Sequence, residues 1–151
     1  MKIGLYPGCS LTGASKDYNE SVIALAEAFG IEFAQIPDWN CCGATAAHNT
    51  NKELSLALPA RIMALAEQNK MEEVVVPCAA CYNRLVVTQS ELKKHPEQKN
   101  KINDVIEMNY NGSLKILNVI EWIDKYIIPN IDEKSRNRLI IKLPATTAVC
   151  L

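Results

Sequence analysis

Short apolar runs and longer stretches of helical periodicity alternate along the first two thirds of the chain. Three segments are short and rich in apolar and β-branched residues, and we predict them as strands: 2–6 (KIGLY), 31–37 (IEFAQIP) and 72–77 (EEVVVP). Each is followed by a loop and then by a helical pattern: 15–29, 52–69 and 78–92. Repeated strand–loop–helix units predict an α/β fold, an open and mostly parallel sheet with flanking helices, of the Rossmann-like kind.

Local signals add detail to these elements. Ser15 is placed to cap the first helix, and Gly30 to end it. Pro59 falls inside the pattern at 52–69 and is expected to kink or split that helix, because proline removes a backbone donor and crowds the preceding turn.

The last third of the sequence predicts packing elements. Residues 96–111 are polar, with a short amphipathic helix at 102–108 (INDVIEM). Residues 114–127 (LKILNVIEWIDKYI) predict a longer helix. Its apolar stripe consists of Ile116, Val119, Ile120, Ile123 and Ile127.

Composition narrows the class of protein. The chain has 151 residues, 48% hydrophobic and 22% charged, which fits one globular domain. Its net charge of −1 does not suggest a surface that binds nucleic acid, and no apolar run approaches the ~20 residues of a membrane span. The apolar start before Pro7 is too short for a signal peptide, so we expect a cytoplasmic protein. Its six cysteines are then metal ligands or redox centres rather than structural disulfides.

Five of the six cysteines come just after a predicted strand: Cys9, Cys41, Cys42, Cys78 and Cys81. The carboxyl ends of parallel strands meet at one edge of a sheet, so these thiols are expected to converge there. Cys41 and Cys42 are adjacent. A disulfide between neighbours would be strained, because relaxed disulfides separate Cα atoms by about 5.5–6 Å and neighbours are about 3.8 Å apart.

Three kinds of site use such thiols. A structural zinc ion takes four ligands, which leaves one thiol over, and an adjacent pair is a poor zinc knuckle. A thiol–disulfide oxidoreductase would use "PCAAC", which places Cys78 at the start of a helix after a buried strand, but the other thiols then have no role. An iron–sulfur cluster uses adjacent cysteines naturally, because they can reach different irons, and Gly8 and Gly43 permit close approach of the backbone.

The segments "YPGCSL", "PDWNCCGA" and "VVPCAACYNRL" resemble the cysteine-rich CCG domain found in the B subunits of heterodisulfide reductases. The resemblance implies a CCG domain over residues 1–143. It also implies a non-cubane [4Fe–4S] cluster held by Cys9, Cys41, Cys42, Cys78 and Cys81. The implied activity is reduction of a small-molecule disulfide, CoM-S-S-CoB or a similar one. The implied partners are the other heterodisulfide reductase subunits, one that contains flavin and iron–sulfur clusters and one that is ferredoxin-like.

Members of that family carry two CCG domains, so a chain with one is expected to be inactive by itself. The last residues are "KLPATTAVCL". Codons can be chosen for them such that one G inserted before the proline codon shifts the reading frame to K-L-A-C-Y-Y-G-C-L-L. That shifted sequence resembles the opening of a second CCG domain. We therefore expect residues 144–151, with Cys150, to be an out-of-frame tail and the second domain to be missing.

Two residues near the paired cysteines have open interpretations. His48 can serve as a proton donor to a leaving thiolate, although a solvated loop histidine is the simpler interpretation. Trp39 can shield a cluster from water, and packing explains it equally well.

Overall fold

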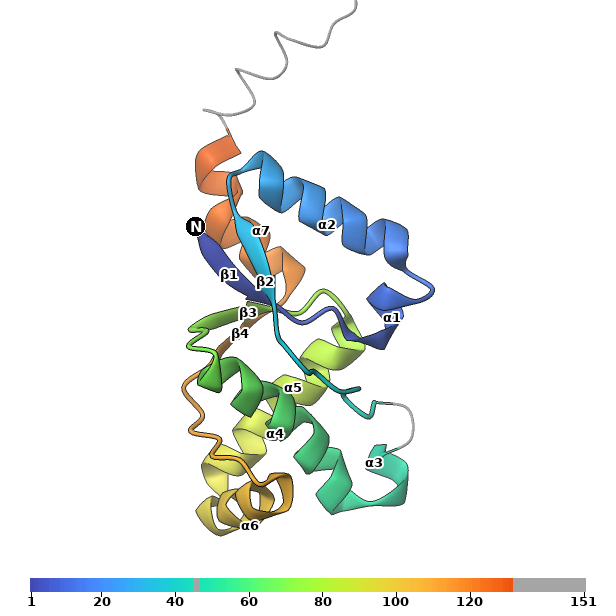
Figure 1. The fold of residues 1–151 in the computed structure, drawn as a ribbon, viewed down its shortest axis with the longest axis vertical. Coiled ribbons are helices and arrows are strands. Elements are labelled where there is room, and N and C mark those ends of the chain that lie inside the picture. The colour runs from blue at the N-terminus through green and yellow to red at the C-terminus, as the bar shows by residue number, and fades with distance from the viewer. Residues whose placement is uncertain (45–46, 132–151) are drawn as a thin grey trace, which may run out of the picture.

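The computed structural model describes residues 1–44 and 47–131, in which a parallel sheet lies between helices (Figure 1). Its strands are β1 (Lys2–Leu5), β2 (Glu32–Gln35), β3 (Glu73–Val75) and β4 (Lys115–Leu117). Their order is β2–β1–β3–β4, and all three neighbouring pairs are parallel. The predicted α/β fold with an open parallel sheet is confirmed.

Helices cover both faces of the sheet. They are α1 (Gly8–Thr12), α2 (Lys16–Ala28), α3 (Ala47–Thr50), α4 (Lys52–Gln68), α5 (Ala79–Lys94), α6 (Pro96–Ile106) and α7 (Val119–Tyr126), followed by the 3-10 turn η1 (Ile128–Asn130). In Figure 1, α2 and α7 lie above the sheet, and α4, α5 and α6 lie below it. The three predicted helices therefore correspond to α2, α4 and α5, and the short helix predicted within 96–111 to α6.

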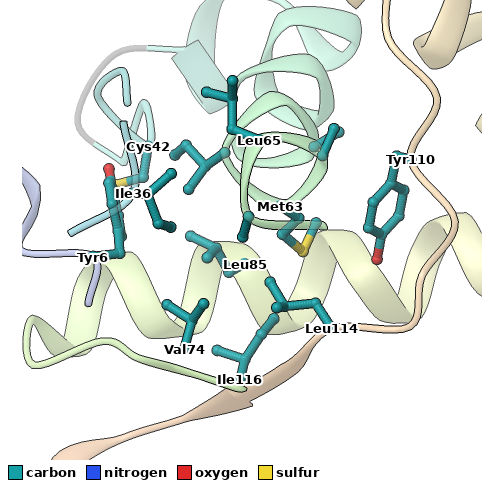
Figure 2. Packing of buried hydrophobic residues seen from close by; sticks show 14 of the residues in the cluster. Tyr6, Ile36, Cys42, Met63, Leu65, Val74, Leu85, Tyr110, Leu114 and Ile116 are labelled. Atoms are coloured by element: carbon teal, nitrogen blue, oxygen red, sulfur yellow. The ribbon is translucent and has the colours of Figure 1, made fainter. Parts of the chain in front are cut away.

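The two faces bury separate hydrophobic clusters. Successive side chains of a strand point to opposite faces, so Val74 packs with Tyr6 and Ile36 on the side of α4 and α5, whereas Val75 packs with Leu5 on the side of α2 and α7. Figure 2 shows the first cluster, with Tyr6 at one end and Tyr110 at the other. Burial on both faces explains the nearly continuous apolar run of β3.

The predicted helix at 114–127 is wrong in its first part, where Lys115–Leu117 forms β4. This segment pairs residue by residue with Glu73–Val75. Asn118 then starts α7 with a capping box: its side chain accepts the N–H of Glu121 at 2.9 Å, and the Glu121 carboxylate accepts the N–H of Asn118 at 2.9 Å. Ile116 thus belongs to the sheet, and Ile120 is 79% exposed rather than part of a buried stripe.

Glu67, near the end of α4, positions β4. Its carboxylate accepts backbone N–H groups at 2.7–3.3 Å from Asn111, Gly112, Ser113 and Leu114. A carboxylate with several N–H donors is a strong anchor, because hydrogen bonds to charged groups exceed neutral ones in strength. The loop that leads into β4 is therefore held by a side chain of α4, the helix that comes before β3 in the chain.

Three details differ from the sequence-based expectation. Pro59 does not split α4, which runs from Lys52 to Gln68 and buries apolar residues on both sides of the proline. Ser15 is the N-cap residue of α2, as predicted, but its side chain makes no capping hydrogen bond. Residues 8–12, expected as a loop, form α1. The tail predicted at 144–151, with Cys150, lies outside the described residues, as does the side chain of His48.

Candidate functional site

The five predicted cysteines lie beyond the carboxyl ends of three neighbouring strands. Cys9 follows β1 and lies in α1 rather than in a loop; Cys41 and Cys42 follow β2 in a segment without regular structure. Cys78 caps α5 after β3, and Cys81 lies in the first turn of that helix. In the described part of the chain these five thiols are free.

The sulfur atoms meet across the strand-end segments. Cys9 Sγ and Cys41 Sγ are 4.0 Å apart, and both side chains are exposed. Cys42 Sγ and Cys81 Sγ are 3.2 Å apart, and these residues are only 3% and 2% exposed. Neighbouring Cys41 and Cys42 therefore make different contacts, one at the surface and one in the core. We call the five residues the thiol rim.

Cys78 belongs to the same cluster. It is half-buried and packs against the core that contains Cys42 and Cys81. Its negative charge, when ionised, is among the influences that raise the pKa of Cys81. The predicted convergence of thiols from three strand ends is thus present in the structure.

Two glycines permit this crowding. Gly8 has φ +67°, and a Cβ there would lie 2.8 Å from Cys81 Sγ. Gly43 has φ +73°, and its N–H donates a hydrogen bond to Cys41 Sγ at 3.4 Å. A larger residue at position 8 would occupy the space of a sulfur atom, which is why the expected glycine is needed there.

A polar network holds the segment that carries Cys41 and Cys42. The Tyr6 hydroxyl donates to the Asn40 carbonyl at 2.8 Å, and the Asn40 side-chain amide donates to the Leu58 carbonyl of α4 at 3.1 Å. Arg61 donates to Asn40 Oδ1 at 3.1 Å and also binds Asp38. These contacts hold a segment that has no secondary structure of its own.

Sequence reasoning gave no role to Tyr6, Asn40 or Arg61. Tyr6 precedes the "PGC" motif, and that adjacency was a usable signal. Arg61 lies on α4, 21 residues from its partner Asn40, and no local pattern links them. Trp39 makes an edge-on contact with Tyr6, with ring centroids 5.5 Å apart, so it packs over the buried side of the network.

The two buried thiols, Cys42 and Cys81, differ in pKa. The hydrogen bond with Cys81 lowers the pKa of Cys42 to about 6, although burial acts in the opposite direction. The same hydrogen bond, together with burial, raises the pKa of Cys81. The two buried sulfurs thus differ in pKa, and Cys81 lies in the first turn of α5, near the positive end of the helix dipole.

The donor atoms of the thiol rim, though not yet placed around one metal ion, are of the kind that a sulfur-ligated cofactor takes. Its atoms are thiol sulfurs, the ligands that zinc and iron–sulfur clusters prefer. Five sulfurs exceed the four ligands of a structural zinc ion. Within residues 1–44 and 47–131, no three His, Cys, Asp or Glu side chains are placed to hold one metal ion.

Comparison with known proteins identifies the family. The cysteine-rich CCG domain matches residues 3–86, more than half of the chain, and this range contains all five cysteines of the thiol rim. The chain belongs to the CCG cysteine-rich domain family. The resemblance stated from the sequence motifs is therefore confirmed.

Three curated relatives are similar over most of this chain. The 8-methylmenaquinol:fumarate reductase membrane anchor subunit of Wolinella succinogenes is 30% identical over 87% of the chain and 45% of that protein. The B subunit of the ferredoxin:CoB-CoM heterodisulfide reductase of Methanosarcina mazei is 27% identical over 85% and 44%. A protein of Archaeoglobus profundus that is named as similar to the heterodisulfide reductase B subunit is 26% identical over 82% and 42%. The chain thus spans less than half the length of each relative.

The fold also has a solved counterpart. A hypothetical protein from Helicobacter pylori superposes with a TM-score of 0.72 at 17% identity, over 83% of this chain and 26% of that one. This likeness shows the fold alone. Among the described helices, none combines the length and the apolarity needed to cross a bilayer.

Proposed function

We propose that this chain is the cysteine-rich electron-transfer domain of an oxidoreductase of the heterodisulfide reductase kind. Residues 1–143 form one CCG domain, and Cys9, Cys41, Cys42, Cys78 and Cys81 hold one non-cubane [4Fe–4S] cluster. The observation that carries the proposal is the meeting of sulfurs from three strand ends, with Sγ–Sγ distances of 4.0 Å and 3.2 Å. Family membership and the names of two curated relatives support it.

A bound cluster supplies one-electron transfer. The protein's own residues determine its surroundings. Cys42 and Cys81 are buried and face away from water, whereas Cys9 and Cys41 are exposed. Tyr6 and Trp39 pack behind the Cys41–Cys42 segment and keep solvent from the inner side. A substrate therefore approaches from the side of Cys9 and Cys41.

The proposed reaction is reduction of a disulfide such as CoM-S-S-CoB. One disulfide accepts two electrons and two protons and yields two thiols, so one cluster suits one-electron transfer and the second step needs the cluster of a second CCG domain. We propose as partners the other heterodisulfide reductase subunits, one with flavin and iron–sulfur clusters and one that is ferredoxin-like. The chain by itself then turns over little substrate. We also propose a cytoplasmic location, where the reducing environment would keep the five cysteines out of disulfides and available to the cluster.

Anaerobic reconstitution with iron and sulfide tests this function. We expect bound iron and acid-labile sulfide together with an EPR signal, and loss of all three in the Cys81→Ser variant. Cys150→Ser is the matched control, because the proposal gives that residue no role. One zinc ion without sulfide would instead support a structural zinc site. If the chain bound neither iron nor zinc and Cys78 were reactive, the result would support thiol–disulfide exchange at "CAAC" and contradict the proposal.

A further inference from the structure

The exposed pair Cys9 and Cys41 has the arrangement of a redox couple. The two sulfurs are 4.0 Å apart and come from segments 32 residues apart in the sequence. A disulfide bond is about 2.05 Å long, so the two exposed side chains need to approach by roughly 2 Å. The Gly43 N–H donates a hydrogen bond to Cys41 Sγ at 3.4 Å.

The buried pair is closer but is less accessible. Cys42 and Cys81 have sulfurs 3.2 Å apart, yet they are only 3% and 2% exposed. Thiol–disulfide exchange begins with attack of a thiolate on a sulfur of an incoming disulfide, so access of that disulfide decides which pair reacts. Access favours Cys9 and Cys41, because both side chains are at the surface.

We propose that, in the chain without a cluster, Cys9 and Cys41 react with a low-molecular-weight disulfide and form a disulfide with each other. The Cys41 thiolate attacks one sulfur of the incoming disulfide, whose S–S bond breaks and releases one thiol. Cys9 then attacks Cys41 Sγ in the mixed disulfide and releases the second thiol. Two cysteine thiols are oxidised, one small disulfide is reduced to two thiols, and the two cysteine protons pass to the leaving thiolates.

This reaction joins the end of β1 to the end of β2 covalently. It also removes two of the five thiols of the rim while the buried pair stays reduced. If the rim holds a cluster, as the proposed function has it, the oxidised chain must be reduced before it can take one. That consequence rests on the proposed function, whereas the disulfide itself does not.

Peptide mapping of the full chain tests the proposal. The chain is freed of metal, reduced, and then treated anaerobically with oxidised glutathione. We expect a Cys9–Cys41 disulfide and no lasting glutathione adduct. Cys9→Ser should leave glutathione bound at Cys41, because the second thiol is absent. Cys41→Ser should likewise form no such disulfide and should leave any glutathione bound at Cys9, because the second thiol of the pair is absent. Cys150→Ser is the control and should keep the Cys9–Cys41 disulfide.

Three outcomes would overturn the proposal: a Cys42–Cys81 or Cys78–Cys81 disulfide that forms first, glutathione adducts that persist on the unsubstituted chain, or no reaction. A second sample is reduced with dithiothreitol and then reconstituted with iron and sulfide. Its cluster content distinguishes the proposed function from the proposed disulfide. A Cys9–Cys41 disulfide without cluster loading would contradict only the proposed function. Cluster loading without that disulfide would contradict only this inference.

Discussion

The residues at the amino-terminal ends of the strands differ in chemistry from those at the carboxyl-terminal ends. We call these two sides of the sheet its amino-terminal and carboxyl-terminal edges. At the amino-terminal edge, charged residues lie opposite one another in register: Lys2 beside Glu32, with a 4.0 Å ion pair, and Glu73 beside Lys115, with a 3.3 Å ion pair. Glu73 also binds Lys125 and the Tyr126 hydroxyl. At the carboxyl-terminal edge, the cysteine sulfurs contact one another across the strand ends.

The difference indicates that the amino-terminal edge stabilises the fold, whereas the carboxyl-terminal edge is a candidate functional site. The Glu73 carboxylate receives three donors from its own chain, so its charge is compensated within the fold. The thiol rim instead gathers groups that repel one another once ionised, and binding of a cation or oxidation relieves that repulsion. Changes at the rim should therefore affect cofactor binding, and changes at the opposite edge should affect stability alone.

The largest expected effect is loss of the proposed cluster. Cys81→Ala removes a sulfur that contacts Cys42 and underlies Gly8, so we expect no iron or sulfide to remain after anaerobic reconstitution and gel filtration. Glu73→Gln, a change at the other edge, should leave the iron content unchanged. Equal iron loss in both variants would show that the two edges are not distinct.

A second prediction concerns the glycine beside Cys81. Gly8→Ala should lower the free energy of unfolding by about 2–4 kcal/mol, because it combines a positive φ with a Cβ 2.8 Å from a sulfur atom. Gly112→Ala is the matched control: its φ is +89°, but its nearest contact is 3.7 Å, so we expect about 1 kcal/mol. Urea unfolding measures both, and equal losses would mean that the sulfur contact costs nothing.

The third prediction concerns pH at the charged edge. Burial acts to raise the pKa of Glu73, but hydrogen bonds from Lys125, Tyr126 and Lys115 outweigh it and lower the pKa. A lowered folded-state pKa gives stability that is present above the unfolded value of about 4.3 and is lost as the pH falls through the folded value.

Glu73→Gln should therefore cost about 1 kcal/mol at neutral pH. It should also flatten the loss of stability below the unfolded-state pKa of a glutamate. Urea unfolding of both proteins at several acidic pH values measures this difference. A mutant whose stability falls with acid as steeply as that of the parent would rule out the assigned role of Glu73.

The smallest effect should come from the outer ion pair. Lys2 and Glu32 are 68% and 74% exposed and 4.0 Å apart, so Lys2→Ala should change the free energy of unfolding by less than about 0.5 kcal/mol. Thermal unfolding at low and high salt measures this change. A loss above about 1 kcal/mol that disappears in salt would show that this pair stabilises the edge more than its exposure indicates.

The sequence predicts the rim well because strand ends and thiols are both local signals. Each of β1, β2 and β3 is a short strand with a cysteine a few residues after it, and parallel pairing brings those ends together. The contacts within the rim are not predictable in this way. That Cys41 contacts Cys9, and Cys42 contacts Cys81, depends on how neighbouring side chains diverge in a segment held by Tyr6.

The missed elements are short ones at boundaries. β4 has three residues, and its apolar positions continue at helical spacing into α7, so one periodic pattern covers two elements. The capping signal Asn118-x-x-Glu121 marks the true start of α7. α1 spans five residues and begins at a glycine without a side-chain cap, so propensity gives no sign of it.

The amino terminus lies at the charged edge, where the Met1 ammonium donates to the Gly30 carbonyl. The four residues of β1, at about 3.3 Å each, then carry the chain to the opposite end of the sheet. A chain immobilised through Met1 would therefore present its sulfur atoms away from the support. That orientation suits voltammetry with soluble redox mediators.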